Sequence, residues 1–229
     1  MICARSGSRK FPGKNLAEIN GKPLIYYSLK AAAESSLLTR AVVSTNSEAV
    51  ATVARSYNAD VPFLRPQEYA TEMARIELAL IHALAYCEME EERQYGAVVL
   101  LQNSSPLRVG SDIDNCIEVL GWTWDWADSS ASVHEFTHPH MLRQLSGKLL
   151  TPLRGYEGIY RRQDVAPLYV MNGAVFVVKR DYLMAHGKVI AEKCTPYIMP
   201  HWRSMDIDAV DDMRIAEGLM DGSVLPVNT

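Results

Sequence analysis

Four cations are concentrated in the first 14 residues, a segment that contains no carboxylate. Two glycines, Gly7 and Gly13, interrupt the segment, and its cations are Arg5, Arg9, Lys10 and Lys14. Exposed backbone N–H groups together with Arg and Lys side chains are what a polyphosphate needs. The segment is not a Walker P-loop, because five residues separate its glycines where that motif has four, and Asn15 replaces the Ser or Thr that would hold Mg²⁺. Two interpretations stay open, a phosphate-binding loop and a solvated basic loop.

A pair of carboxylates lies near the other end of the chain, in Asp206 and Asp208. In an extended segment, residues two apart point to the same side, so both carboxylates can face one cation. Hard oxygen ligands of this kind suit Mg²⁺ or Mn²⁺ that bridges substrate phosphates. The alternative is a pair of solvent-facing acids that precede a helix N-terminus.

Two further polar segments adjoin apolar runs. Residues 102–108, Gln-Asn-Ser-Ser-Pro-Leu-Arg, follow the apolar run 97–101 directly. They form either a binding loop at the end of a strand or an ordinary turn. Asn172-Gly173 precedes another apolar run, 174–178, and by itself predicts a turn.

Apolar runs alternate with helical patterns along the chain. The run 97–101 is apolar throughout, as in a strand that is buried on both faces of a parallel sheet. Ser47 can cap the N-terminus of one helix, and Ser111 with Asp114 has the spacing of a capping box for another. Further helices are expected around 78–85 and 213–219. This alternation predicts an α/β fold with a doubly wound, mostly parallel sheet.

One region breaks the alternation, between about residues 132 and 170. It has short alternating pieces and glycines and lacks a clear helical period, which favours a β-rich insertion that projects from the sheet. Residues 1–131 and 171–229 would then form the α/β domain, which contains the candidate phosphate-binding loop.

Composition excludes several classes of protein. The 229 residues carry 23 Lys and Arg against 27 Asp and Glu, a net charge of −4, which argues against a surface that binds nucleic acid or an anionic membrane nonspecifically. No apolar run approaches the roughly 20 residues of a membrane-spanning helix. The start lacks the apolar region of a secretory signal, and the four scattered cysteines predict free thiols in a reducing compartment, with Cys87 and Cys116 buried. A cytoplasmic location is therefore expected.

The order of these motifs resembles that of the acylneuraminate cytidylyltransferases, also called CMP-sialic acid synthetases. The resemblance rests on Ala-Arg-x-Gly-Ser-(x)₄-Gly-Lys-Asn-Leu at the start, Leu-Leu-Gln-x-x-Ser-Pro-Leu-Arg, Asn-Gly-Ala and the Asp-x-Asp tail. It extends from Cys3 to Glu217 and implies a Rossmann-like nucleotidyltransferase fold. Members of the family transfer CMP from CTP to the anomeric hydroxyl of a nine-carbon 2-keto acid sugar and release pyrophosphate.

The resemblance implies a role for each matching residue. Arg5, Lys14 and Asp206 are the expected catalytic residues, and Asp206 and Asp208 would hold Mg²⁺ or Mn²⁺. The sugar would contact Gln102, Arg162 and Asn172, with Arg162 as the partner of its carboxylate. The expected nucleotide-binding residues are Ala4, Arg5, Ser8, Arg9, Lys14, Asn15 and Arg65. Either the metal lowers the pKa of the sugar hydroxyl or Asp206 accepts its proton. The family is typically homodimeric, which gives the β-rich insertion a role in dimerisation and in completing the sugar pocket.

Two alternative functions stay open, and one of them follows from a departure from the family pattern. Residues 71–75, Thr-Glu-Met-Ala-Arg, replace a segment in which a small hydroxyl commonly helps to read the base. A nonenzymatic nucleotide-binding homologue is therefore one alternative, and a CMP-Kdo synthetase, which shares the fold and opening loop, is another. The identity of the nonulosonic acid depends on the shape of the pocket, which residue spacing does not reveal.

Overall fold

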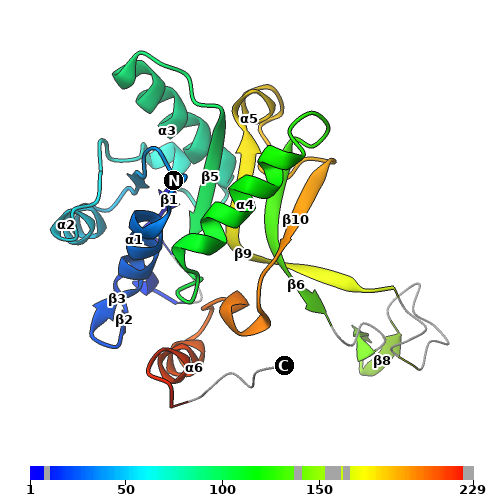
Figure 1. The fold of residues 1–229 in the computed structure, drawn as a ribbon. Helices are drawn as coiled ribbons and strands as arrows, with labels where there is room; N and C mark the ends of the chain where they lie inside the picture. Colours follow the sequence, from blue (N-terminus) through cyan, green and yellow to red (C-terminus); the bar gives the residue numbers. More distant parts are fainter. Residues whose placement is uncertain (8–10, 137–140, 153–160, 162–165, 224–229) are drawn as a thin grey trace.

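The computed structural model describes residues 1–7, 11–136, 141–152, 161 and 166–223. Within these ranges the longer helices alternate with strands along much of the chain (Figure 1). The helices are α1 (Leu24–Glu34), α2 (Glu48–Ser56), α3 (Ile76–Glu91), α4 (Gly110–Trp122), α5 (Arg180–His186) and α6 (Val210–Met220). Short 3-10 helices in these ranges include η1 (Lys14–Leu16), η2 (Gln67–Tyr69) and η5 (His201–Ser204). None of the helices in this part of the chain is long and apolar enough to cross a bilayer.

The central sheet has six strands in the order β10-β6-β9-β5-β1-β4. Its strands are β1 (Ile2–Cys3), β4 (Val43–Ser44), β5 (Ala97–Gln102), β6 (Ser129–Phe136), β9 (Leu168–Lys179) and β10 (Cys194–Ile198). β1 pairs in parallel with β4 and β5, and β10 pairs in parallel with β6, whereas β9 runs antiparallel to both of its neighbours. The predicted α/β fold with a mostly parallel sheet is confirmed. Two small antiparallel pairs complete the strands, β2 (Glu18–Ile19) with β3 (Lys22–Pro23) and β7 (Arg143–Ser146) with β8 (Leu149–Pro152).

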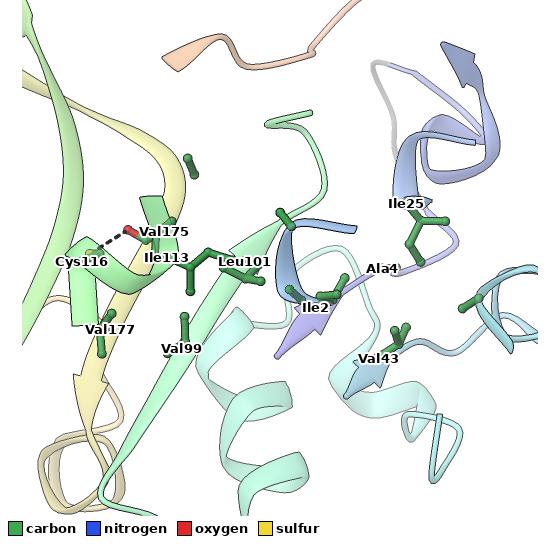
Figure 2. Close-up of a cluster of buried hydrophobic side chains, with 14 of the residues drawn as sticks. Ile2, Ala4, Ile25, Val43, Val99, Leu101, Ile113, Cys116, Val175 and Val177 are labelled. Atoms are coloured by element: carbon green, nitrogen blue, oxygen red, sulfur yellow. Dashed lines mark hydrogen bonds between the residues drawn. The ribbon is translucent and has the colours of Figure 1, made fainter. Parts of the chain in front are cut away.

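Helices bury both faces of the sheet. Side chains of β5 alternate between the faces, with Val99 and Leu101 packed against α1, α2 and α4, and Val98 and Leu100 packed against α3 and α5. Figure 2 shows part of the first cluster, in which Leu101 is fully buried. Burying a side chain of this size stabilises a fold by about 1.5–3 kcal/mol relative to leaving it exposed. This two-sided burial explains why residues 97–101 are apolar throughout, as predicted.

The capping predictions for two helices have opposite outcomes. The Ser47 hydroxyl accepts a hydrogen bond from the Val50 N–H at 3.3 Å and caps α2, as predicted. The predicted capping box of Ser111 with Asp114 is wrong. Asp112 instead accepts from the Val109 N–H at the start of α4, and Asp114 accepts from Ser35, Ser36 and Leu37. A capping pattern in sequence cannot reveal a competing partner that lies almost 80 residues away.

The turn predicted at Asn172-Gly173 is also wrong, because both residues lie inside β9. Pairing between β6 and β9 shifts at this point, from Ala131 opposite Phe176 to Val133 opposite Met171. Gly173 has φ +77°, in the left-handed region that favours glycine. The Asn-Gly pair therefore forms an irregularity that bends a continuing strand.

Strands β6 and β9 continue beyond this irregularity as a two-stranded arm, with Phe136 opposite Leu168. The β7–β8 hairpin lies beyond the arm, away from the helices of the sheet (Figure 1). The described part of residues 132–170 is thus β-structured, although its treatment as a separate insertion stays a prediction. Cys87 and Cys116 are buried free thiols, as predicted, and Cys3 and Cys194 are free as well.

Candidate functional site

Strands β1, β4 and β5 all end at one edge of the sheet, because they are parallel to one another. A cavity of about 570 Å³ opens there, beside the point where the chain's strand order reverses between β1 and β5. Such a switch point is where open α/β sheets bind ligands. We call it the carboxyl-end cavity. It is lined by Cys3, Arg5, Gly7, Lys14, Asn15, Arg65, Tyr69, Glu72, Ala74, Ile76, Gln102, Asn103, Ser104 and Asp208.

Lys14 joins the two ends of the chain at this cavity. Gly13, at φ 73°, turns the opening loop into η1, on which Lys14 is the first residue. The Lys14 Nζ donates to the Ile207 carbonyl at 2.7 Å and lies 4.0 Å from the Asp208 carboxylate. The opening loop and the Asp-x-Asp tail, predicted separately from the sequence, thus meet at one place. Ser8 and Arg9 lie outside the described residues, so their expected contacts stay predictions.

Asn15 fixes the opening loop to the ends of β1 and β5. Its side-chain amide donates to the Arg5 carbonyl at 2.9 Å, and its Oδ1 accepts from Asn103 at 3.2 Å. Asn103 also donates to the Cys3 carbonyl at 3.4 Å. These amides hold the loop against the cavity wall.

The two arginines of the cavity contact neutral acceptors. Arg65 is buried, and it donates to the hydroxyl of Ser44 at 2.9 Å and to its carbonyl at 2.6 Å. Arg5 donates to the Thr71 carbonyl at 3.1 Å. Neutral acceptors orient a guanidinium without cancelling its charge, so the cavity keeps a field that attracts anions.

Ala4 lies behind this wall. It is fully buried, and its N–H donates to the Ser44 carbonyl at 3.0 Å within the sheet. In this arrangement the Ala4 N–H is not available to a nucleotide, and Ala4 contributes by placing Arg5 at the cavity.

The segment 102–108 is held by a buried arginine. Arg108 donates to the carbonyls of Gln102 at 3.0 Å and Ala174 at 2.8 Å, and to the Ser28 hydroxyl at 2.7 Å. Burial lowers the pKa of Arg108 to about 10. Arg108 thus ties the segment to three elements, β5, β9 and α1, which distinguishes it from an ordinary surface turn.

The residues expected at the sugar are not all brought together. Gln102 lines the carboxyl-end cavity, and its side-chain amide lies against Gly173, whose φ of +77° favours glycine. Asn172 is 6% exposed, is not a lining residue, and makes its hydrogen bonds to the protein interior. The structure therefore does not place Asn172 where a sugar-binding residue was expected. Arg162 lies outside the described residues.

Asp206 and Asp208 flank the fully buried Ile207 and are both exposed, as expected for alternate residues of an extended segment. Only Asp208 lines the cavity, which departs from the expectation that both face one cation. No group of three or more His, Cys, Asp or Glu side chains in the described residues could hold a metal ion by itself. Mg²⁺ commonly binds one or two carboxylates plus substrate phosphates, and Asp208 beside a cationic cavity fits that kind of site.

One wall of the cavity contains no residue predicted individually from the sequence as a site residue, although the family resemblance linked residues 71–75 to recognition of the base. It consists of Tyr69, Glu72, Ala74 and Ile76, from the segment that departs from the expected family pattern. A parallel bridge between Thr45 and Leu64 aligns this segment with the end of β4. That pairing is nonlocal, so no periodicity or motif in the segment could have placed it.

A cationic cavity at the strand-order reversal of a doubly wound sheet defines an α/β protein with a site for an anionic ligand. Residues 1–182 match the model of a family described as Cytidylyltransferase. The chain belongs to this family.

Two relatives agree with this assignment, and one solved structure shares the fold. The chain is 31% identical to the CMP-N,N'-diacetyllegionaminic acid synthase of Legionella pneumophila, over 96% of the chain and 95% of the relative. It is 32% identical to an N-acylneuraminate cytidylyltransferase of Streptococcus agalactiae, over 93% of the chain and 50% of the relative. The fold is similar, with a TM-score of 0.70 and 15% identity, to that of a CMP:2-keto-3-deoxy-manno-octonic acid synthetase complexed with CTP, over 97% of this chain and 98% of that one.

Proposed function

We propose that the protein transfers CMP from CTP to the anomeric hydroxyl of a nonulosonic acid and releases pyrophosphate. The observation that carries the proposal is the convergence of Lys14 and Asp208 at the carboxyl-end cavity, where Lys14 also contacts Ile207, 193 residues away in the sequence. The names of the relatives from Legionella and Streptococcus support a sugar of the legionaminic or neuraminic type.

The reaction is an in-line displacement at the α-phosphorus, which chiefly demands positioning and stabilisation of developing negative charge. Lys14 and Arg5 would bind the triphosphate, and Arg65, held rigidly by Ser44, would orient the cytosine. Gln102 would contact the sugar. Asp208, with Asp206 beside it, would hold Mg²⁺ or Mn²⁺, which when bound to the phosphates neutralises their charge.

Asp206 has a less direct role in this arrangement. Its carboxylate is exposed and outside the cavity lining, so it would accept the proton of the sugar hydroxyl only after the segment 205–209 moved toward the sugar. Asp208 is therefore the better single position at which to test the metal role.

We also propose that a second copy of the chain covers the arm and the β7–β8 hairpin, within the predicted insertion 132–170. Several large apolar side chains are exposed in the described part of this range, namely Met141, Leu142, Leu145, Leu149, Leu150, Tyr169 and Val170. Exposed apolar surface rimmed by polar residues is typical of a protein interface. A homodimer in solution at micromolar concentration, measured by light scattering, is the expected result, and a monomer would contradict it.

The reaction is tested by mixing the protein with CTP, Mg²⁺ and one sugar at a time and measuring pyrophosphate. The sugars are N-acetylneuraminic, legionaminic, pseudaminic and 2-keto-3-deoxy-manno-octonic acid. Turnover is expected with at least one of the first three. Turnover with only the fourth would assign the chain to the Kdo-type enzymes, and none with any sugar by a folded dimer would contradict the enzymatic proposal.

Asp208→Ala is expected to abolish metal-dependent turnover while leaving the fold intact. Asp181→Ala, which removes an exposed carboxylate from α5, is the matched control and should retain turnover. Unchanged activity of Asp208→Ala would refute the proposed metal role.

A further inference from the structure

Asn172 has no hydrogen-bonding capacity left for a ligand. Its Oδ1 accepts from the Ser132 hydroxyl and from the Ala174 N–H at 3.0 Å. Its Nδ2 donates to Ser204 Oγ at 2.9 Å and to Met199 Sδ at 3.3 Å. A side-chain amide offers two donors and about two acceptor positions, and all four are occupied. The contact with Ser204 points to a different role, because η5 leads directly into the segment that carries Asp206 and Asp208.

A second contact fixes η5 to a different element, α4. Arg203 donates through Nη2 and Nε to the two oxygens of Asp112, at 2.8 and 3.2 Å. Asp112 is fully buried in the first turn of α4, where it also accepts from the Tyr197 hydroxyl at 3.0 Å. Burial disfavours the charged guanidinium, but the hydrogen bonds and charge of Asp112 outweigh this effect and raise the pKa of Arg203. Two parallel hydrogen bonds fix the orientation of the Arg203 guanidinium as well as its distance from Asp112.

The rest of the acidic segment is held by main-chain contacts. The Ile207 N–H donates to the Ser104 carbonyl at 2.7 Å, and the Asp212 carboxylate accepts from the N–H groups of Asp208 and Ala209. The Ile207 carbonyl accepts from Lys14, which in the proposed reaction also binds the triphosphate. When Lys14 turns toward a ligand, it releases the Ile207 carbonyl. The position of Asp208 then depends more on the contacts that Ser204 and Arg203 of η5 make.

From these contacts we propose that Asn172 and Asp112 are positioning residues, which act through Ser204 and Arg203 to hold Asp208 opposite Lys14. This assignment rests on the function proposed above. It gives Asn172 a role in metal binding through the chain, in place of direct contact with the sugar. Outer residues that orient metal ligands typically contribute about 10- to 100-fold to metal affinity.

The test compares two buried serines, each of which donates one hydroxyl hydrogen bond to a main-chain carbonyl. Ser204→Ala removes a hydroxyl of η5 that contacts Asn172 and the Pro200 carbonyl. Ser130→Ala is the matched control. Ser130 lies on β6, outside the cavity lining, and its hydroxyl donates to the Cys116 carbonyl of α4 at 2.6 Å. The readouts are the dissociation constant of Mn²⁺ in the presence of CTP, measured by electron paramagnetic resonance, and the Mg²⁺ activation constant of turnover.

Ser204→Ala is expected to raise both constants about tenfold, and Ser204→Thr, which keeps the hydroxyl, should restore them. In Ser130→Ala both constants should match those of wild type. In an Asp208→Asn background, Ser204→Ala should produce no further loss of Mn²⁺ affinity, because the effect passes through Asp208. Equal losses in Ser204→Ala and Ser130→Ala, or unchanged Mn²⁺ affinity in Ser204→Ala, would overturn the proposal.

Asn172→Ala separates the two roles of that residue. Positioning predicts the same loss of Mn²⁺ affinity as in Ser204→Ala and no additional loss in the double variant. A raised KM for the sugar with unchanged Mn²⁺ affinity would instead restore the sugar-binding assignment. If wild type binds Mn²⁺ with CTP but turns over no sugar, the Mn²⁺ measurements still decide the positioning role while the reaction assignment fails. If wild type binds no Mn²⁺, the positioning role fails as well.

Discussion

At the amino ends of β1, β4 and β5, Arg40 contacts three carboxylates, whereas at the carboxyl ends of the same strands Arg5 and Lys14 contact main-chain carbonyls. Arg40 donates to Asp60, Glu90 and Glu91 at 2.7–2.8 Å. Burial alone would lower the pKa of Arg40, but the hydrogen bonds to Glu90 and Asp60 outweigh burial and raise it. The carboxylate nearest to Lys14, that of Asp208, is half exposed and 4.0 Å away.

This difference separates cations that hold the fold from cations that serve the site. The charge of Arg40 is cancelled within the protein, so little of it reaches solvent. In the Lys14–Asp208 pair, the Lys14 side chain is 19% exposed and that of Asp208 is 53% exposed. A partly exposed ion pair at 4 Å contributes at most about 1 kcal/mol net, which a multiply charged ligand can outcompete. The carboxyl-end cations therefore keep their charge for an anionic ligand.

The largest effect is expected from Lys14→Met, which removes one of these uncancelled charges. Transition-state stabilisation by a charged group contributes about 10²–10³ to the rate, so kcat/KM for CTP should fall by about that factor. The thermal midpoint of unfolding should change little. Pyrophosphate release measures the rate, and Lys14→Arg, which keeps the charge, should lose less. Equal losses in both variants would indicate that shape rather than charge matters at this position.

Arg40→Met should have the opposite pattern. Because the three acidic partners are 26–46% exposed, losing the cluster should lower the free energy of unfolding by only about 1–2 kcal/mol. Urea unfolding measures this loss, and kcat/KM per folded molecule should match that of wild type. A large loss of activity in Arg40→Met with unchanged stability would break the distinction between the two ends of the sheet.

The smallest effect concerns acid, at the ion pair between Glu88 and Arg180 near the start of β5. Hydrogen bonds from Arg180, at 2.9 and 3.0 Å, hold the pKa of Glu88 below its ordinary value. A carboxyl whose pKa is lower in the folded state stabilises the fold above its unfolded pKa, near 4.3, and loses this contribution as pH falls through the folded value. The unfolding free energy of Glu88→Gln should therefore fall less between about pH 5 and pH 3 than that of wild type. Urea titrations at each pH measure the difference, and parallel pH curves for the two proteins would contradict the assignment.

Patterns within a few consecutive residues predicted the features of the fold that such short segments can specify. The apolar run of β5 and the Ser47 cap of α2 are each recognisable within a few consecutive residues, and both predictions are confirmed. The approach of Lys14 to Asp208 followed from the family resemblance rather than from either segment alone.

The remaining features depend on partners far away in the chain. Asn172-Gly173 has the signature of a turn. The Ser132 hydroxyl, 40 residues before Asn172, donates to the Asn172 side chain and accepts from the Val175 N–H. These contacts keep Asn172 and Gly173 inside β9. The Tyr69–Ile76 wall of the cavity likewise depends on the nonlocal bridge between Thr45 and Leu64. No pattern within either segment could carry this information.

The central claim, that the carboxyl-end cavity binds CTP through its uncancelled cations, is tested most directly by calorimetric titration of CTP. Wild type, Lys14→Met and Arg40→Met would be titrated in the same buffer with Mg²⁺ present. We predict that the dissociation constant of CTP rises at least about tenfold in Lys14→Met, equivalent to 1.4 kcal/mol, and is unchanged in Arg40→Met. Equal affinity of wild type and Lys14→Met for CTP would contradict the claim.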